Sequence, residues 1–204
     1  MKTETLNSCD TPRERRPRER IIETARDLFR RHGLRGVGVE TIAEAAGTNK
    51  MTLYRHFSSK DDLIVACLSE AAVDLNRMWA EFEADHPGDP MAQLQEWVQG
   101  AAECAVMDTR GCDLANAAVE LTEIGHPARK VIAQFKIDQR NRLAELCKAA
   151  KIPQADLLAD TLYLLIEGAR VSSQSIPDDG PAHRFIDICN AVIASFQGRP
   201  LTCK

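Results

Sequence analysis

Apolar residues recur at helical spacing soon after the start of the chain. Ile21, Ala25, Leu28 and Phe29 follow one another at intervals of four, three and one, and charged side chains occupy the opposite face. This pattern predicts an amphipathic helix that ends near His32–Gly33, where glycine adopts the left-handed conformation that closes a helix. Two shorter helices are expected at about 39–46 and 49–57, separated by Gly47.

Longer periodic segments follow. A long helix is predicted over 61–85, because apolar residues recur there at steps of three and four. Further helices are expected at about 91–107, 113–124, 128–150, 154–175 and 181–197, with glycine or proline in the connections. No segment shows the alternation of period two that is typical of a strand. The pattern therefore predicts an all-α fold.

Two of these segments, 157–171 and 185–196, are apolar around most of the helix circumference. A helix at the surface of a monomer needs only one apolar stripe. We therefore expect the second apolar face of both helices to be buried by another packing partner. The second cover that we expect is another subunit, packed as a four-helix bundle across a two-fold axis. The candidate interface residues are Leu162, Leu165, Ala169, Ser172, Ile188, Val192 and Phe196.

Charge is distributed unevenly over the 204 residues. Residues 1–60 carry a formal net charge of +5 and residues 61–204 one of −9, which together make the overall −4. This asymmetry predicts that only the N-terminal part meets a polyanion. Residues 1–17 are polar and basic and are expected to form a disordered arm. Neither a signal segment nor an apolar run of membrane-spanning length is found, so a cytoplasmic location is expected.

Residues 42–57 (IAEAAGTNKMTLYRHF) have the spacing of two short helices that cross at a sharp angle. Ala43 is small enough for the crossing point, Gly47 serves the turn, and Leu53 anchors the second helix. The opposite face of that helix is rich in hydrogen-bond donors, and a helix fits the major groove of DNA. We therefore interpret this segment as a helix-turn-helix unit.

Two stretches carry a specific family pattern: IIETARDLFRRHG at 21–33 and IAEAAGTNKMTLYRHFSSKDDL at 42–63. They resemble the DNA-binding domain of the tetracycline-repressor (TetR) family of bacterial transcriptional regulators. Many members have glycine at the position of Met51, and serine or threonine at that of Gly38. By resemblance, the residues expected to contact DNA are Thr48, Asn49, Lys50, Met51, Thr52, Tyr54, Arg55, His56 and Lys60.

The resemblance implies a homeodomain-like three-helix DNA-binding domain at 18–60, and a helical effector-binding and dimerisation domain at 61–204. It further implies a homodimer on a palindromic operator of double-stranded DNA, released by a small molecule. The C-terminal part combines a few large aromatic residues with many alanines, which favours a cavity for an apolar or aromatic effector over a solidly filled core. The candidate effector residues are Trp79, Phe82, Trp97, Ala101, Asn116, Glu120, Phe135 and Tyr163.

Motifs for other chemistry are missing. The chain has no GxSxG, HExxH or P-loop motif, and its one GxG lacks the third glycine of a dinucleotide site. We therefore predict no catalytic activity, no cofactor and no metal. Two alternatives stay open: a thiol- or metal-sensing regulator with the same DNA-binding head, for which Cys104 and Cys112 are the candidate thiols, and a helical enzyme or carrier.

Overall fold

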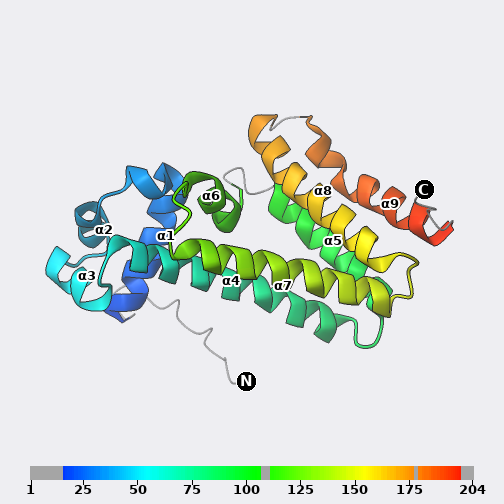
Figure 1. Cartoon of the computed structure of the whole chain (residues 1–204), viewed down its shortest axis with the longest axis horizontal. Coiled ribbons are helices and arrows are strands. Elements are labelled where there is room, and N and C mark those ends of the chain that lie inside the picture. The colour runs from blue at the N-terminus through cyan, green and yellow to red at the C-terminus, as the bar shows by residue number, and fades with distance from the viewer. Residues whose placement is uncertain (1–15, 107–110, 177–178, 199–204) are drawn as a thin grey trace, which may run out of the picture. The chain divides into compact units, whose positions relative to one another are not determined.

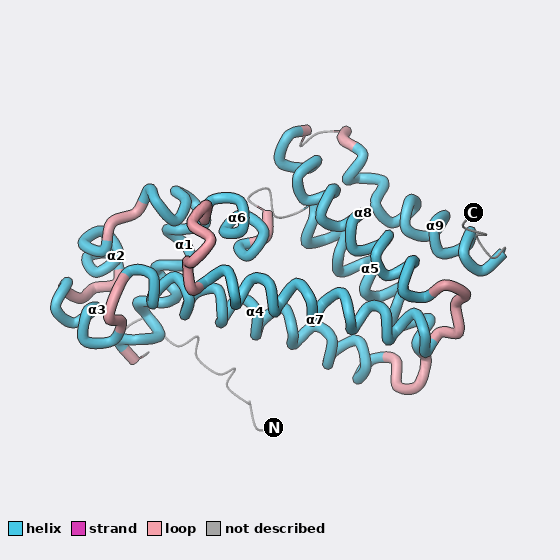
Figure 2. The backbone as a smooth tube through the Cα atoms, viewed as in Figure 1, coloured by secondary structure: helices cyan, strands magenta, loops and turns pink. Residues whose placement is uncertain are grey.

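The computed structural model describes residues 16–106, 111–176 and 179–198. These ranges fold into helices and contain no strand, as Figure 2 shows, which confirms the all-α prediction. Most of the predicted arm, 1–15, lies outside the described residues. In chain order, as labelled in Figure 1, the elements are α1 (Pro17–Gly36), α2 (Val39–Ala45), α3 (Lys50–His56), α4 (Lys60–Asp85), α5 (Pro90–Val106), α6 (Asp113–Glu120), α7 (Ala128–Ala149), α8 (Ala155–Ser175), the 3-10 helix η1 (Pro181–Arg184) and α9 (Phe185–Gly198).

The chain divides into two compact units, Met1–Cys67 and Leu68–Lys204. Helix α4 begins in the first unit and continues into the second. The functional domains expected at 18–60 and 61–204 stay a prediction, because compactness alone assigns no role to a unit. No helix within the described ranges is long and apolar enough to cross a membrane.

In the first unit, α1, α2 and α3 all pack against one another. Their shared core contains Ile21, Ile42 and Leu53, none of which is exposed. Gly47 has a φ of +63° in the turn between α2 and α3, a conformation that glycine adopts without steric cost. Gly33 interrupts α1 with a φ of +76°, close to the predicted helix end, although helical turns resume up to Gly36.

In the second unit, α8 packs against α5, α7, α9 and η1. Its inner face buries apolar side chains on successive turns, among them Leu158, Leu162 and Ile166. Helices α7 and α8 are also joined by a two-pronged ion pair: Arg140 donates from Nε to Asp160 at 2.6 Å and from Nη2 at 3.1 Å. The hydrogen bond from Arg140 holds the pKa of the Asp160 carboxyl below its usual value.

The outer face of α8 carries a second apolar stripe. Leu157, Leu164 and Val171 recur every seven residues and are 40%, 71% and 64% exposed. Gly168 lies between the last two, and a methyl group added to it would meet nothing within 4 Å. The expectation of a second apolar face on α8 is therefore met by this chain, and this stripe is available to a partner.

The residues first expected in that interface require correction. Leu162, Ala169 and Phe196 are buried within the subunit, so they are unavailable to a second copy. Leu165 and Val192 are half-buried and pack against the same core. Helix α8 is apolar on nearly all sides, and the face expected to meet a partner packs instead inside the subunit, where α8 contacts α5 and α7. Of the remaining candidates, Ser172 and Ile188 are half-buried.

Candidate functional site

Helix α3 is held at both ends and presents its polar side outward. The Asn49 side chain caps its first turn by accepting a hydrogen bond from the Thr52 N–H at 2.9 Å. Leu53 is fully buried and Phe57, just after the helix, is 4% exposed. Anchored in this way, the helix exposes Lys50, Met51, Tyr54 and Arg55 and keeps Thr52 half-buried.

Lys50 is connected to the preceding helix. Its ammonium group forms an ion pair with Glu40 of α2 and lies 5.9 Å from the centre of the Tyr54 ring. The hydrogen bond between Lys50 and Glu40 raises the pKa of Lys50 and lowers that of Glu40. Lys50 therefore stays charged, and any DNA group that it contacts competes with Glu40. Sequence reasoning missed Glu40, which lies ten positions away on another helix.

The other predicted DNA contacts differ in access. Thr48 is half-buried in the turn before α3, and the side-chain oxygen of Asn49 is already used by the cap. His56 is half-buried, and its Nε2 is buried without a hydrogen-bond partner among the described residues. Lys60 begins α4, with its ammonium group 5.9 Å from the centre of the Phe29 ring.

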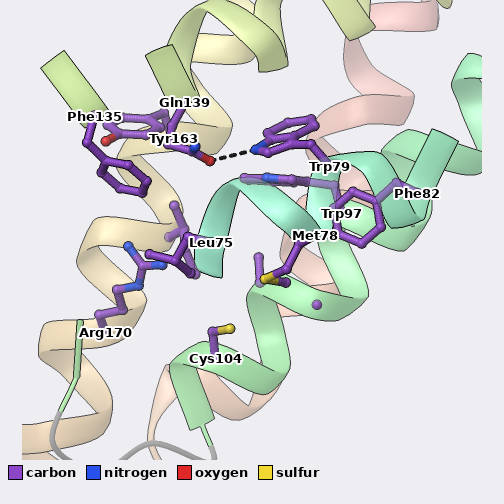
Figure 3. A pocket seen from close by; sticks show the side chains of 13 residues that line it. Leu75, Met78, Trp79, Phe82, Trp97, Cys104, Phe135, Gln139, Tyr163 and Arg170 are labelled. Atoms are coloured by element: carbon purple, nitrogen blue, oxygen red, sulfur yellow. Dashed lines mark hydrogen bonds between the residues drawn. The ribbon is translucent and has the colours of Figure 1, made fainter. Parts of the chain in front are cut away.

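The second unit contains a cavity among α4, α5, α7 and α8, shown in Figure 3. The volume of the cavity is about 60 Å³. This is room for roughly four to six water molecules at about 10–15 Å³ each. Aromatic and small side chains dominate its lining. The lining residues are Leu75, Met78, Trp79, Phe82, Trp97, Gly100, Ala101, Cys104, Phe135, Gln139, Tyr163, Ile166 and Arg170.

The structure brings together most of the effector residues expected from the sequence: Trp79, Phe82, Trp97, Ala101, Phe135 and Tyr163 all line this cavity. Asn116 and Glu120 do not line it within the described part of the chain. They lie on α6, a short helix that packs against α7, with Asn116 exposed and Glu120 half-buried. The role of these two in orienting a ligand stays a prediction.

Polar groups on the lining come from three helices. Trp79 donates from Nε1 to the Gln139 side-chain oxygen at 2.7 Å, and Gln139 in turn donates to Asn76 at 2.8 Å. Burial raises the pKa of the Tyr163 hydroxyl well above its usual value, so this group is neutral and able to donate at physiological pH. The sequence analysis missed Gln139 and Arg170. Arg170 lies seven residues after Tyr163, which is the spacing of one helix face.

Apart from the buried Cys67, the cysteines of the described residues fall into two groups. Cys147 and Cys189 are fully buried, and burial raises the pKa of each thiol to about 12, so neither is a reactive thiolate at neutral pH. Cys104 is half-buried and lines the cavity, and Cys112 is half-buried at the start of α6. Within the described ranges, no three histidine, cysteine or acidic residues gather as metal ligands do.

Comparison with known proteins agrees with this geometry. Residues 21–67 match the family model described as bacterial regulatory proteins of the tetR family. The chain is 34% identical over 183 residues to the transcriptional repressor AcnR of Corynebacterium diphtheriae, covering 88% of this chain and 93% of AcnR. It is 25% identical over 157 residues to the regulator AcrR of Shigella flexneri, covering 74% and 73%.

Solved structures show the same likeness. A putative TetR transcriptional regulator from Streptomyces avermitilis has a TM-score of 0.76 at 28% identity, covering 89% of this chain and 98% of that one. A TetR-family regulator from Streptomyces coelicolor shares the fold, with a TM-score of 0.80 at 24% identity, covering 89% and 96%. From its family pattern, its exposed α3 helix and these relatives, the chain belongs to the TetR family and is a DNA-binding transcriptional regulator.

Proposed function

We propose that this protein is a homodimeric repressor that a small apolar or aromatic ligand releases from a palindromic operator. The observation that carries the proposal is an aromatic-lined cavity in a chain that also presents a DNA-reading helix. Repression is favoured because the relative AcnR, which aligns over 88% of this chain, is named a repressor.

A dimer supplies the two reading heads that a palindrome requires. Two α3 helices would enter successive major grooves about 34 Å apart on one face of the duplex. The outer stripe of α8, Leu157–Leu164–Val171, is the surface we assign to the contact with a second copy. Gly168 supports this assignment. A glycine inside a helix lowers its stability, but it lets another helix approach the backbone closely, and within the subunit nothing lies within 4 Å of a methyl group added there.

Ligand release requires a difference in affinity between two states. A ligand weakens DNA binding only if it binds the state that is less competent for DNA more tightly. Helix α4 is the element we propose as the connection, because it lines the cavity through Leu75, Met78 and Trp79 and starts three residues after Phe57, which closes α3. A change in the cavity that shifts α4 would therefore reach the reading helix along one continuous helix.

Two variants of the DNA-binding face should differ in whether they weaken sequence-specific or general DNA binding. Tyr54→Ala, on the exposed face of α3, should weaken binding to the operator more than binding to scrambled DNA. Lys60→Ala should weaken both equally and lower the salt slope by about one per subunit, because it removes one phosphate contact. Fluorescence anisotropy with DNA from upstream of the protein's own gene, at several salt concentrations, measures both. Operator binding by Tyr54→Ala that equals wild type would rule out this docking.

A third variant tests the cavity. Trp97→Ala removes a large lining side chain and should blunt both the thermal stabilisation by a ligand and the release of operator DNA by that ligand. A thermal-shift screen identifies stabilising compounds, and operator anisotropy then measures release. Met91→Ala is the matched control, because Met91 lies on the same helix α5 but does not line the cavity. Ligands that stabilise Trp97→Ala and release its DNA as in wild type would place their site elsewhere.

One observation favours a second candidate: Cys104 lies on the cavity lining. A thiol in that position would let an electrophile or oxidant act as the input of the same DNA-binding head. Native mass spectrometry with and without reductant separates the two functions. A covalent adduct or disulfide at Cys104 that releases DNA would favour thiol sensing, and release by a reversible ligand from a Cys104→Ser variant would favour the first proposal.

A further inference from the structure

We infer that the ligand of this cavity is an apolar or aromatic acid whose carboxylate pairs with Arg170. The inference rests on the proposed function, since it names the chemical class of the effector. Arg170 is the charged residue on the lining in the described part of the chain, and Figure 3 shows its side chain extending from its helix into the group of lining side chains.

Among the described residues, the charges around Arg170 do not balance. Glu167 forms an ion pair with Arg170 at 2.9 Å and a second, shorter one with Lys136 of α7. One carboxylate therefore faces two cations, which leaves one positive charge in excess. The side chains of Arg170, Lys136 and Glu167 are only 15%, 20% and 30% exposed, so solvent screens this charge weakly. A ligand that brings one negative charge would neutralise the cluster.

Arg170 also has donors to offer. A guanidinium carries five N–H groups in a planar fork that matches the two oxygens of a carboxylate. Among the hydrogen bonds of the described residues, the guanidinium makes one, from Nη1 to Glu167 at 2.9 Å. We assign the Nε and Nη2 groups, which make no hydrogen bond to the other described residues, to the ligand carboxylate. The neutral hydroxyl of Tyr163, which lines the same cavity, is a further donor.

The remaining lining suits the rest of such a ligand. Trp79, Trp97, Phe82 and Phe135 supply aromatic surface for a ring or a short apolar chain. Aromatic faces also attract organic cations, but here the excess positive charge would repel one. The Tyr163 ring is in addition already approached by Lys136, whose ammonium group lies 5.8 Å from the ring centre. The balance of charge thus favours an acid over an amine.

Three probes of nearly equal shape test this inference: 3-phenylpropanoate, its neutral amide 3-phenylpropanamide, and the cation 3-phenylpropylamine. Isothermal titration of the full-length protein should show the acid binding at least about tenfold more tightly than the amide, because a charge-assisted bond is about twice as strong as a neutral one. The amine should bind most weakly. This ranking is measured on the wild-type protein and so does not depend on how any variant folds.

Variants then assign the preference to one residue. Arg170→Gln should bring the affinity for the acid down to that for the amide, while the amide changes by less than about twofold. Arg170→Lys keeps the charge without the planar fork and should retain part of the preference. Arg142→Gln is the matched control, since Arg142 is an exposed arginine of α7 that does not line the cavity, and it should bind all three probes as wild type does.

The outcomes separate this inference from the proposed function. Three results would contradict the inference that the ligand is an acid. They are equal binding of acid and amide by the wild type, an unchanged preference for the acid in Arg170→Gln, and no binding of any probe. If the amide binds as tightly as the acid and also releases operator DNA, the inferred ligand class is wrong and the ligand-gated function holds. If the acid binds through Arg170 but leaves DNA binding unchanged, the inferred ligand class holds and the ligand-gated function is wrong.

Discussion

Replacing Leu164 with arginine is expected to leave the protein monomeric and to weaken operator binding at least about 100-fold. Leu164 is 71% exposed in the middle of the outer apolar stripe of α8. In the proposed dimer it would be buried against the same stripe of a second copy. An unpaired charge buried there costs about 3–5 kcal/mol, which corresponds to a factor of roughly 100 or more in association. Sedimentation velocity at micromolar concentration measures the mass, and anisotropy measures operator binding.

The control for this variant is Val119→Arg. Val119 is 83% exposed on α6, so the substitution puts the same charge on an exposed apolar site of a different helix. It should remain dimeric and bind the operator normally. A Leu164→Arg protein that still sediments as a dimer would contradict the assignment of this face. A wild-type protein that is monomeric at micromolar concentration would contradict the dimer altogether.

Leu53→Ala is expected to destabilise the first unit by about 2–5 kcal/mol and to abolish operator binding at physiological temperature. Leu53 is fully buried where α3 packs against α1 and α2, so truncation leaves a cavity that this small three-helix core fills poorly. Both tryptophans lie in the second unit, so their fluorescence would miss the change. Hydrogen exchange of backbone amides in 21–67 measures it directly, supported by circular dichroism during urea unfolding.

Met51 provides the matched control for Leu53. It lies two positions earlier on the same helix and is 79% exposed. Met51→Ala should change stability by no more than about 0.5 kcal/mol, as surface substitutions usually do. If both variants lose similar protection in 21–67, α3 does not pack by the face described here.

Helices and the DNA-reading segment could be predicted from sequence because their signals are local. Gly47 marks the turn, Asn49 the cap and Leu53 the anchor, all within seven residues. Much of the cavity lining was also predictable, because large aromatic residues such as Trp97 and Phe135 stand out among alanines. These predictions needed only spacing and residue size, and no knowledge of which helices meet.

The orientation of α8 could not be predicted in the same way. When a helix is apolar around most of its circumference, periodicity does not say which face packs inside the subunit. Leu162 and Leu164 differ by only two positions but point to opposite sides. The seven-residue recurrence of Leu157, Leu164 and Val171 is a signal that could have found the outer face.

Ion pairs between helices could not be predicted from the sequence either. The ion pair of Glu40 with Lys50 and that of Lys136 with Glu167 join residues 10 and 31 positions apart. Charged residues of this kind usually lie on solvated faces, and only the packing of the helices brings each pair together. The same packing turns Arg170, which in the sequence is one of many arginines, into a lining residue of the cavity.

In the proposed mechanism, the cavity and the DNA-reading helix are energetically coupled. The most direct test is to titrate operator DNA with the protein in the absence and in the presence of a saturating cavity ligand, and to measure the affinity for the ligand with and without bound operator. The ligand should weaken DNA binding about 5- to 150-fold, and DNA should weaken ligand binding by the same factor, since coupling is reciprocal. A ligand that occupies the cavity and leaves both affinities unchanged would contradict it.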